Sequence, residues 1–63
     1  MTLREIEIKL KSLYQQLDLM RLYQNEMLLQ VGQKRYQALI DDTLDQITFY
    51  QNQRKKRIEN DES

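Results

Sequence analysis

The amino-acid sequence predicts an all-α protein, folded as an antiparallel two-helix hairpin. Three observations support this prediction. The chain has no Pro and only one Gly, it is rich in Gln, Leu, Lys, Arg and Glu, and its apolar residues recur in steps of three and four. Pro and Gly are the strongest helix breakers, and the enriched residues lose little freedom in a helix. Apolar steps of three and four place a stripe on one face of a helix.

The first predicted helix begins with a capping box. Thr2 is followed three residues later by Glu5, and at this spacing the hydroxyl and the carboxylate satisfy backbone N–H groups of the first turn. An apolar stripe, here called the first inner stripe, then follows with Gln24 as its one polar member. Its members are Leu3, Ile6, Leu10, Leu13, Leu17, Met20, Gln24, Met27 and Val31. We therefore predict a helix over about 3–30.

A turn is predicted at Gly32, because glycine adopts the left-handed conformations that end helices without steric cost. A second inner stripe follows and consists of Tyr36, Ile40, Thr43, Ile47, Tyr50 and Arg54. In one continuous helix the two stripes would lie about 110° apart around the axis, so a single rod would not join them. A reversal over about 31–34 lets them face each other. The second helix is accordingly predicted over about 35–57.

The predicted hairpin forms one domain over 1–58, and the polar residues 59–63 are expected to fray as a tail. A chain of 63 residues buries only about 60 % of the surface that its unfolded form exposes. Proteins of this size usually gain stability from disulfides, metals or association. With no Cys and no His in the chain, association is the expected route.

Composition also argues against several functional classes. Ten Lys and Arg balance ten Asp and Glu, so no net charge attracts nucleic acid or a membrane surface. The longest apolar runs are two or three residues, and we expect neither a transmembrane span nor a signal peptide. The absence of Cys fits a reducing compartment, so the expected location is the cytoplasm.

Catalysis and cofactor binding are not expected. Without His or Cys, and with Ser only at positions 12 and 63, the chain offers no nucleophile with a base. Asp41, Asp42 and Asp45 offer carboxylates near one another, but acidic residues in early helix turns are favoured by the helix dipole. No third ligand of suitable spacing accompanies Asp41 and Asp45, so neither a metal nor another cofactor is predicted.

Apolar residues on the back of the first helix point to function. One antiparallel partner helix covers one face only, and leaving a Leu or Ile in water forgoes about 1.5–3 kcal/mol. Contiguous exposed apolar surface usually marks an association site, whereas single apolar residues scattered on a surface are common. The predicted partner-binding residues are Ile8, Leu19, Leu22, Tyr23 and Leu29 on the first helix and Phe49 on the back of the second. Ser12, Gln15 and Glu26 interrupt this face, which favours a one-sided contact over a closed symmetrical core.

Two other interpretations stay open. The hairpin could self-associate into a four-helix bundle, or the basic run Arg54 to Arg57 could contact RNA while tyrosines stack on bases. Against RNA binding, Tyr14, Tyr36 and Tyr50 lie on or near the inner stripes, where they are predicted to be core residues. The basic run also ends a helix, where cations suit the dipole.

Several short motifs over positions 1–50 are those of a known family. They are the opening Met1-Thr2-Leu3 with Glu5, a long first helix, a turn at Gly32, the pair Tyr36-Gln37, and the apolar residues Leu39, Leu44, Ile47 and Tyr50. In these features the chain resembles the small helical-hairpin co-chaperones of type III secretion needle subunits. The resemblance implies a cytoplasmic protein that binds a larger helical-repeat chaperone. Together the pair would keep the needle subunit soluble until export.

Overall fold

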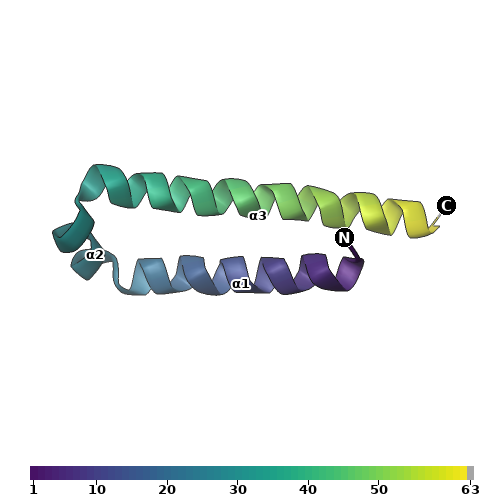
Figure 1. The fold of residues 1–63 in the computed structure, drawn as a ribbon, viewed down its shortest axis with the longest axis horizontal. Coiled ribbons are helices and arrows are strands. Elements are labelled where there is room, and N and C mark those ends of the chain that lie inside the picture. The colour runs from purple at the N-terminus through teal and green to yellow at the C-terminus, as the bar shows by residue number, and fades with distance from the viewer. Residues whose placement is uncertain (63) are drawn as a thin grey trace.

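The computed structural model describes residues 1–62, with side chains through Glu59, and this part of the chain is all-α. It forms three helices, α1 (Leu3–Leu22), α2 (Gln24–Val31) and α3 (Gln33–Glu62). Helices α1 and α3 lie side by side and run in opposite directions, and α2 closes one end of the molecule (Figure 1). The result is a rod of 50 × 16 × 14 Å.

The all-α prediction is confirmed, but the number and the bounds of the helices differ from those predicted. The stretch predicted as one helix over 3–30 is divided at Tyr23 into α1 and α2. The chain reverses through the break at Tyr23, α2 and Gly32, not over 31–34 alone (Figure 1), and α3 continues to Glu62, beyond the predicted end at position 57. The expected fraying of 59–63 stays a prediction, because Ser63 and the side chains after Glu59 lie outside the described residues.

The start of α1 matches the predicted cap. The Thr2 hydroxyl oxygen accepts a hydrogen bond from the Glu5 backbone N–H at 3.2 Å. The same hydroxyl donates to the Glu5 carboxylate at 3.1 Å, so the carboxylate binds the hydroxyl and not a backbone N–H as predicted. The helical ladder begins where the Ile6 N–H donates to the Thr2 carbonyl at 3.1 Å.

The division of the first predicted helix falls at Tyr23, whose backbone leaves the helical region (φ −101°, ψ 25°). In a continuous helix the inner stripe would carry the amide of Gln24 toward the core. Burying an amide without hydrogen-bond partners costs about 1–3 kcal/mol. In the structure Gln24 is exposed, and Leu28 packs against the core beside Met27. The break therefore replaces a polar side chain with an apolar one at the inner face.

The break also leaves a backbone carbonyl to be satisfied. In a continuous helix the Met20 carbonyl would accept from the N–H of Gln24, four residues on. The hydroxyl of Tyr36, on α3, donates to this carbonyl at 3.2 Å in a buried position. Tyr36 thus fastens the end of α1 to α3.

Gly32 alone joins α2 to α3. Its φ of 86° is positive as predicted, but its ψ of 158° is extended and not helical. This region of backbone space is accessible essentially to glycine only. The Gly32 N–H donates to the Leu28 carbonyl at 3.0 Å, and its carbonyl accepts from the Tyr36 N–H at 3.0 Å. One residue therefore ends α2 and begins α3.

The core follows the two inner stripes along the contact between α1 and α3. Its buried side chains are Ile6, Leu10, Leu13, Leu17, Met20, Tyr36, Thr43 and Ile47. Met27, Leu28, Val31, Ile40 and Tyr50 are partly buried around them. The hydroxyl of buried Thr43 is satisfied within its own helix, since it donates to the Leu39 carbonyl one turn earlier, at 3.0 Å. Arg54, the last member of the second stripe, is exposed.

Tyr14 is not the core residue that its position near the first stripe predicts. Its side chain is exposed, and its hydroxyl accepts a hydrogen bond from Gln51 of α3 at 2.6 Å. On a helical wheel Tyr14 lies at the edge of the first inner stripe. At such a position a tyrosine can keep its hydroxyl in water. Of the three tyrosines assigned to the core, Tyr36 is buried and Tyr50 is half-buried.

Candidate protein-interaction surface

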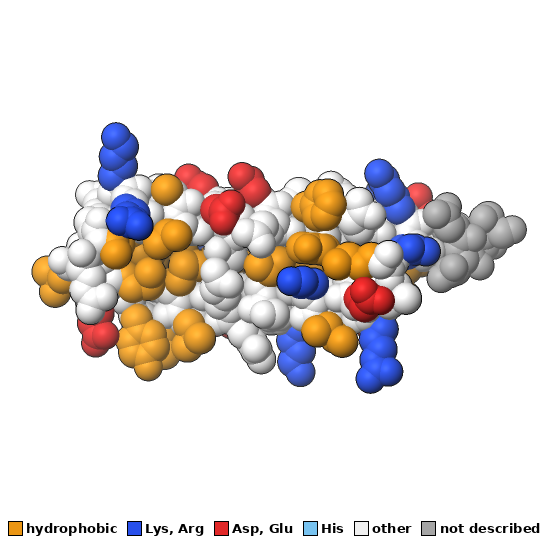
Figure 2. Space-filling view, in the orientation of Figure 1, with side chains coloured by type: hydrophobic (Ala, Val, Ile, Leu, Met, Phe, Trp, Pro, Cys, Tyr) orange, Lys and Arg blue, Asp and Glu red, His pale blue; other side chains and the backbone are white. Residues whose placement is uncertain are grey.

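All six residues predicted to bind a partner are exposed large hydrophobic side chains in the structure. The exposed fraction is 56 % for Leu19, 72 % for Leu22 and 88 % for Leu29, and Ile8, Tyr23 and Phe49 are also exposed. Figure 2 shows hydrophobic side chains gathered over the α2 end of the rod, with a second group along the contact between α1 and α3. The hairpin therefore leaves apolar surface in water that its own helices do not cover.

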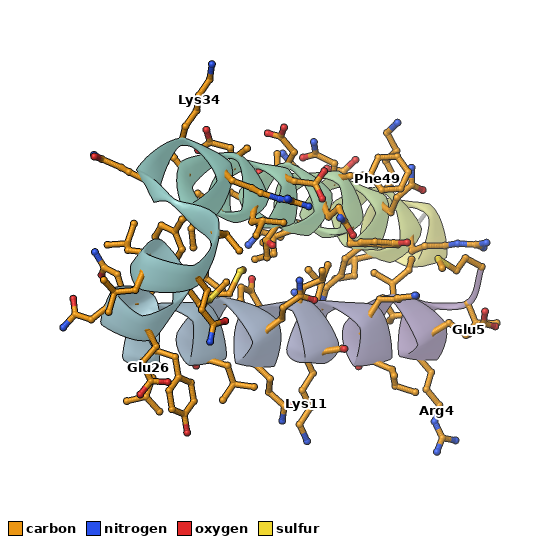
Figure 3. All side chains as sticks on the ribbon, turned by 60° about the vertical axis from the view of Figure 1, so that its left-hand side comes forward. Arg4, Glu5, Lys11, Glu26, Lys34 and Phe49 are labelled. Atoms are coloured by element: carbon orange, nitrogen blue, oxygen red, sulfur yellow. The ribbon has the colours of Figure 1, made fainter. Side chains whose placement is uncertain are left out.

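These residues form one group and two outliers. Leu19, Leu22 and Tyr23 lie within the last turns of α1 and at its break, and Leu29 follows on α2. Ile8 shares the outer face of α1 but lies about 16 Å from Leu19 along the helix, at 1.5 Å per residue. Phe49 projects from the side of α3 away from α1 (Figure 3). Its ring meets Tyr50 edge to face, with centroids 5.2 Å apart, so Phe49 does not join the group on α1.

Polar residues complete a regular row that follows the outer face of α1 and ends in the first turn of α2. The row, here called the outer stripe, consists of Arg4, Ile8, Lys11, Gln15, Leu19, Leu22 and Glu26. Its steps are four and three residues, and its members on α1 lie within about 80° of the circumference at 100° per residue. All seven side chains are exposed. This spacing is visible in the sequence, but Arg4 and Lys11 are not apolar and so were not among the predicted partner-binding residues.

Charge divides the outer stripe into two halves. Arg4 and Lys11 make its beginning basic, and Glu26 makes its end acidic. Figure 3 shows Arg4 and Lys11 extending from α1 away from α3, with Glu26 on that same side at the α2 end. Asp18, exposed beside the stripe, adds negative charge to the same half as Glu26. The surface is thus apolar in part and oppositely charged at its two ends.

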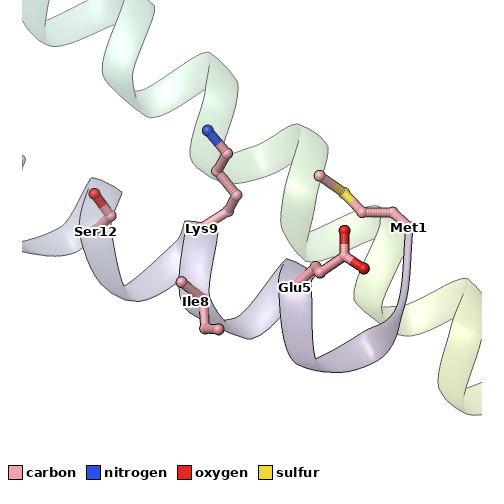
Figure 4. Close-up of a pocket in the computed structure, with 5 residues that line it drawn as sticks. All are labelled: Met1, Glu5, Ile8, Lys9 and Ser12. Carbon is pink, nitrogen blue, oxygen red and sulfur yellow. The ribbon is translucent and has the colours of Figure 1, made fainter.

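An open pocket of about 320 Å³ adjoins the outer stripe near the start of α1 (Figure 4). It is lined by Met1, Glu5, Ile8, Lys9 and Ser12. Glu5, Ile8, Lys9 and Ser12 have the spacing of the four residues that surround one inserted side chain in a coiled coil. The pocket is therefore lined by two apolar residues, Met1 and Ile8, and by one acidic and one basic residue, Glu5 and Lys9.

A second pocket, of about 330 Å³, lies where α1 meets α3 and is bridged by polar contacts. Arg54 Nε lies 3.5 Å from Glu7 Oε1, and both side chains are about half exposed. Such exposed pairs contribute about 0.2–1 kcal/mol. Because Arg54 is paired with Glu7, only Lys55, Lys56 and Arg57 of the predicted basic run have no salt bridge among the described residues.

The acidic residues Asp41 and Asp42 lie on α3 and bond to neighbouring side chains. Within residues described by the structure, no group of three acidic side chains is placed to hold a metal ion. Asp41 and Asp42 accept hydrogen bonds from the side chains of Gln37 and Gln46, at 3.1 and 2.9 Å. None of the described helices combines the length and the apolar character that crossing a bilayer requires.

Family models, curated proteins and solved structures were compared with the chain, and none matches it. The surface itself thus carries the functional proposal.

Proposed function

We propose that this chain is a protein-interaction module, with no catalytic activity of its own, that binds a partner protein through the outer stripe with Tyr23 and Leu29. The observation that carries the proposal is the exposure of Leu19, Leu22 and Leu29 at one end of the rod. Covering each such side chain would contribute about 1.5–3 kcal/mol. The small inner core of α1 and α3 leaves the protein in need of this contribution.

The shape of the surface favours a helical partner. A straight helix with anchors at steps of three and four residues fits a groove between helices, where the anchors enter successive pockets. Grooves of this kind occur along helical-repeat proteins, which stack pairs of helices into extended concave surfaces. A helical-repeat protein therefore supplies a suitable binding site for α1.

The resemblance to needle-subunit co-chaperones makes this proposal more specific. We propose that the partner is a helical-repeat chaperone in the cytoplasm, and that the pair keeps a type III secretion needle subunit soluble before export. Support comes from the small size, the exposed helical anchors and the short motifs over positions 1–50. In this role the hairpin stabilises its partner while the partner covers the hairpin's exposed apolar surface.

The test is affinity capture from the native host with the wild-type chain and with Leu19→Gln/Leu22→Gln as bait. We expect the double variant to keep its helicity, since surface substitutions usually shift stability by about 0.5 kcal/mol or less. It should lose the captured partner, because truncating central anchors costs about 2 kcal/mol or more each. Mass spectrometry identifies the lost protein, and circular dichroism reports the helicity of each bait.

The matched control is Leu39→Gln/Leu44→Gln, which makes the same chemical change at two partly exposed positions on α3. This control should retain the partner. If both double variants bind equally well, the binding site lies elsewhere. If Leu19→Gln/Leu22→Gln loses helicity, those residues belong to the core and the proposed surface is wrong.

A further inference from the structure

We propose that, in the isolated protein, a second copy of the same chain occupies the outer stripe in antiparallel orientation. This inference rests on the proposed function, since it takes the same surface and names one occupant. The dimer would be a row of four helices, because the outer stripe lies on the side of α1 opposite α3. A homologous face on each copy is what a two-fold symmetric interface requires.

The outer stripe is symmetric about Gln15. Ile8 and Leu22 each lie seven residues from Gln15, on opposite sides, and Lys11 and Leu19 each lie four residues from it. An antiparallel second copy centred on Gln15 therefore superimposes the α1 part of the stripe, from Ile8 to Leu22, on itself. In this register Ile8 faces Leu22 of the second copy, and Lys11 faces Leu19 of the second copy. Steps of three and four on both copies are those of interlocking coiled-coil helices.

Charge selects the same register. Arg4 lies at the basic end of the stripe, and Glu26, in the first turn of α2, lies at the opposite end on the same side (Figure 3), so the antiparallel arrangement brings each Arg4 toward Glu26 of the second copy. Lys11 also comes within one position of Asp18 of the second copy. A parallel dimer would place Arg4 against Arg4 and Glu26 against Glu26, and like charges in contact are destabilising. The charged members Arg4, Lys11 and Glu26 thus meet opposite charges in the antiparallel dimer and like charges in the parallel one.

The pocket beside Ile8 provides space for the facing side chain. Leu22 is 72 % exposed, and its counterpart on the second copy comes over Ile8 at the edge of the pocket. The two-fold axis repeats this contact, so each copy inserts one Leu22 and receives one. A single pair of helices buries less surface than a standard interface, which buries about 1,600 Å². The dimer should therefore dissociate on dilution.

Sedimentation equilibrium of the isolated chain at low salt tests the inference, over protein concentrations from about 1 to about 500 μM. The wild-type mass should rise with concentration from 7.8 kDa toward twice that value. Arg4→Glu or Glu26→Arg alone should raise the dissociation constant about ten-fold, because two ion pairs become two like-charge contacts. The double variant Arg4→Glu/Glu26→Arg should restore dimerisation by reversing both charges.

Lys34→Glu is the matched control, since it makes the same charge change on α3 at a side chain that points away from α1 (Figure 3). It should leave the dissociation constant unchanged, and circular dichroism should show that every variant stays helical. A wild-type chain that is monomeric throughout, or a double variant that stays as weak as the single ones, overturns the antiparallel dimer. Capture of a host protein that depends on Leu19 and Leu22 would then still support the proposed function, so the two failures are distinguishable.

Discussion

At the residue scale, two buried hydroxyl groups show how polar atoms are satisfied inside the core. Tyr36 is the clearest case, because its ring is part of the core while its hydroxyl binds the Met20 carbonyl at the end of α1. Thr43 makes a different use of a buried hydroxyl, which donates back to its own helix. Both residues carry a polar atom into an apolar contact, and both satisfy it with a backbone carbonyl.

Removing the Tyr36 hydroxyl should destabilise the fold. Tyr36→Phe leaves the buried Met20 carbonyl without this donor, and an unsatisfied buried group costs about 1–3 kcal/mol. The control is Tyr14→Phe, which removes an exposed hydroxyl and should change stability by about 0.5 kcal/mol or less. Urea unfolding followed by circular dichroism measures both. Equal effects of the two substitutions would show that the Tyr36 hydroxyl does not support the break.

At the element scale, two short interruptions shape the rod. The break at Tyr23 turns Gln24 outward and brings Leu28 against the core, and Gly32 ends α2 where α3 begins. Helix α2 between them has no buried residue, although Met27, Leu28 and Val31 are partly covered. A short helix held by few apolar contacts is the part of the molecule where local opening should occur first.

Gly32 should be sensitive to substitution for backbone reasons alone. A Cβ at this position would meet no atom within 4 Å, so steric contact is not the cause. Gly32→Ala forces a side chain into a region that costs about 1–3 kcal/mol, and Gly32→Val should cost at least as much. Gln33→Ala, at the next residue, is the control and should be nearly neutral. A thermal midpoint that rises in Gly32→Val would instead indicate a continuous helix.

At the scale of the whole molecule, the stability of the rod depends on one narrow layer between α1 and α3. A domain of this size is stabilised by only about 3–9 kcal/mol, at 0.05–0.15 kcal/mol per residue. Few residues of the described part are buried, while the outer stripe is open to water. The same helix thus supplies the core on one side and the candidate interface on the other.

The two sides of α1 should differ in how much the same substitution destabilises the fold. Leu17 is 8 % exposed, so Leu17→Ala should cost about 2–5 kcal/mol, which is enough to unfold much of the population. Leu22→Ala should change stability by about 0.5 kcal/mol or less when measured below the dissociation constant of the dimer. Thermal unfolding of both variants makes the comparison. A well-folded Leu17→Asp protein would show that the inner stripe has been misplaced.

The sequence determined the features that depend on local periodicity. The capping residue Thr2, the two inner stripes apart from Gln24 and Arg54, the positive φ of Gly32 and the exposure of Leu19 and Leu22 were all predictable. Each depends on spacing within one helix or on the conformational freedom of one residue, and both are present in the chain before it folds. The spacing of the outer stripe is also present in the sequence, but the structure shows that its charged and apolar members are all exposed.

Tertiary structure decided the features that depend on what lies across from each residue. The break before Gln24 leaves that side chain exposed, and Tyr36 of α3 supplies a donor for the Met20 carbonyl. Tyr14 is exposed and Phe49 is separated from the outer stripe because the crossing of α1 and α3 fixes which flank of each helix faces water. A helical wheel describes one helix at a time, whereas the burial of a side chain depends on how two helices pack together.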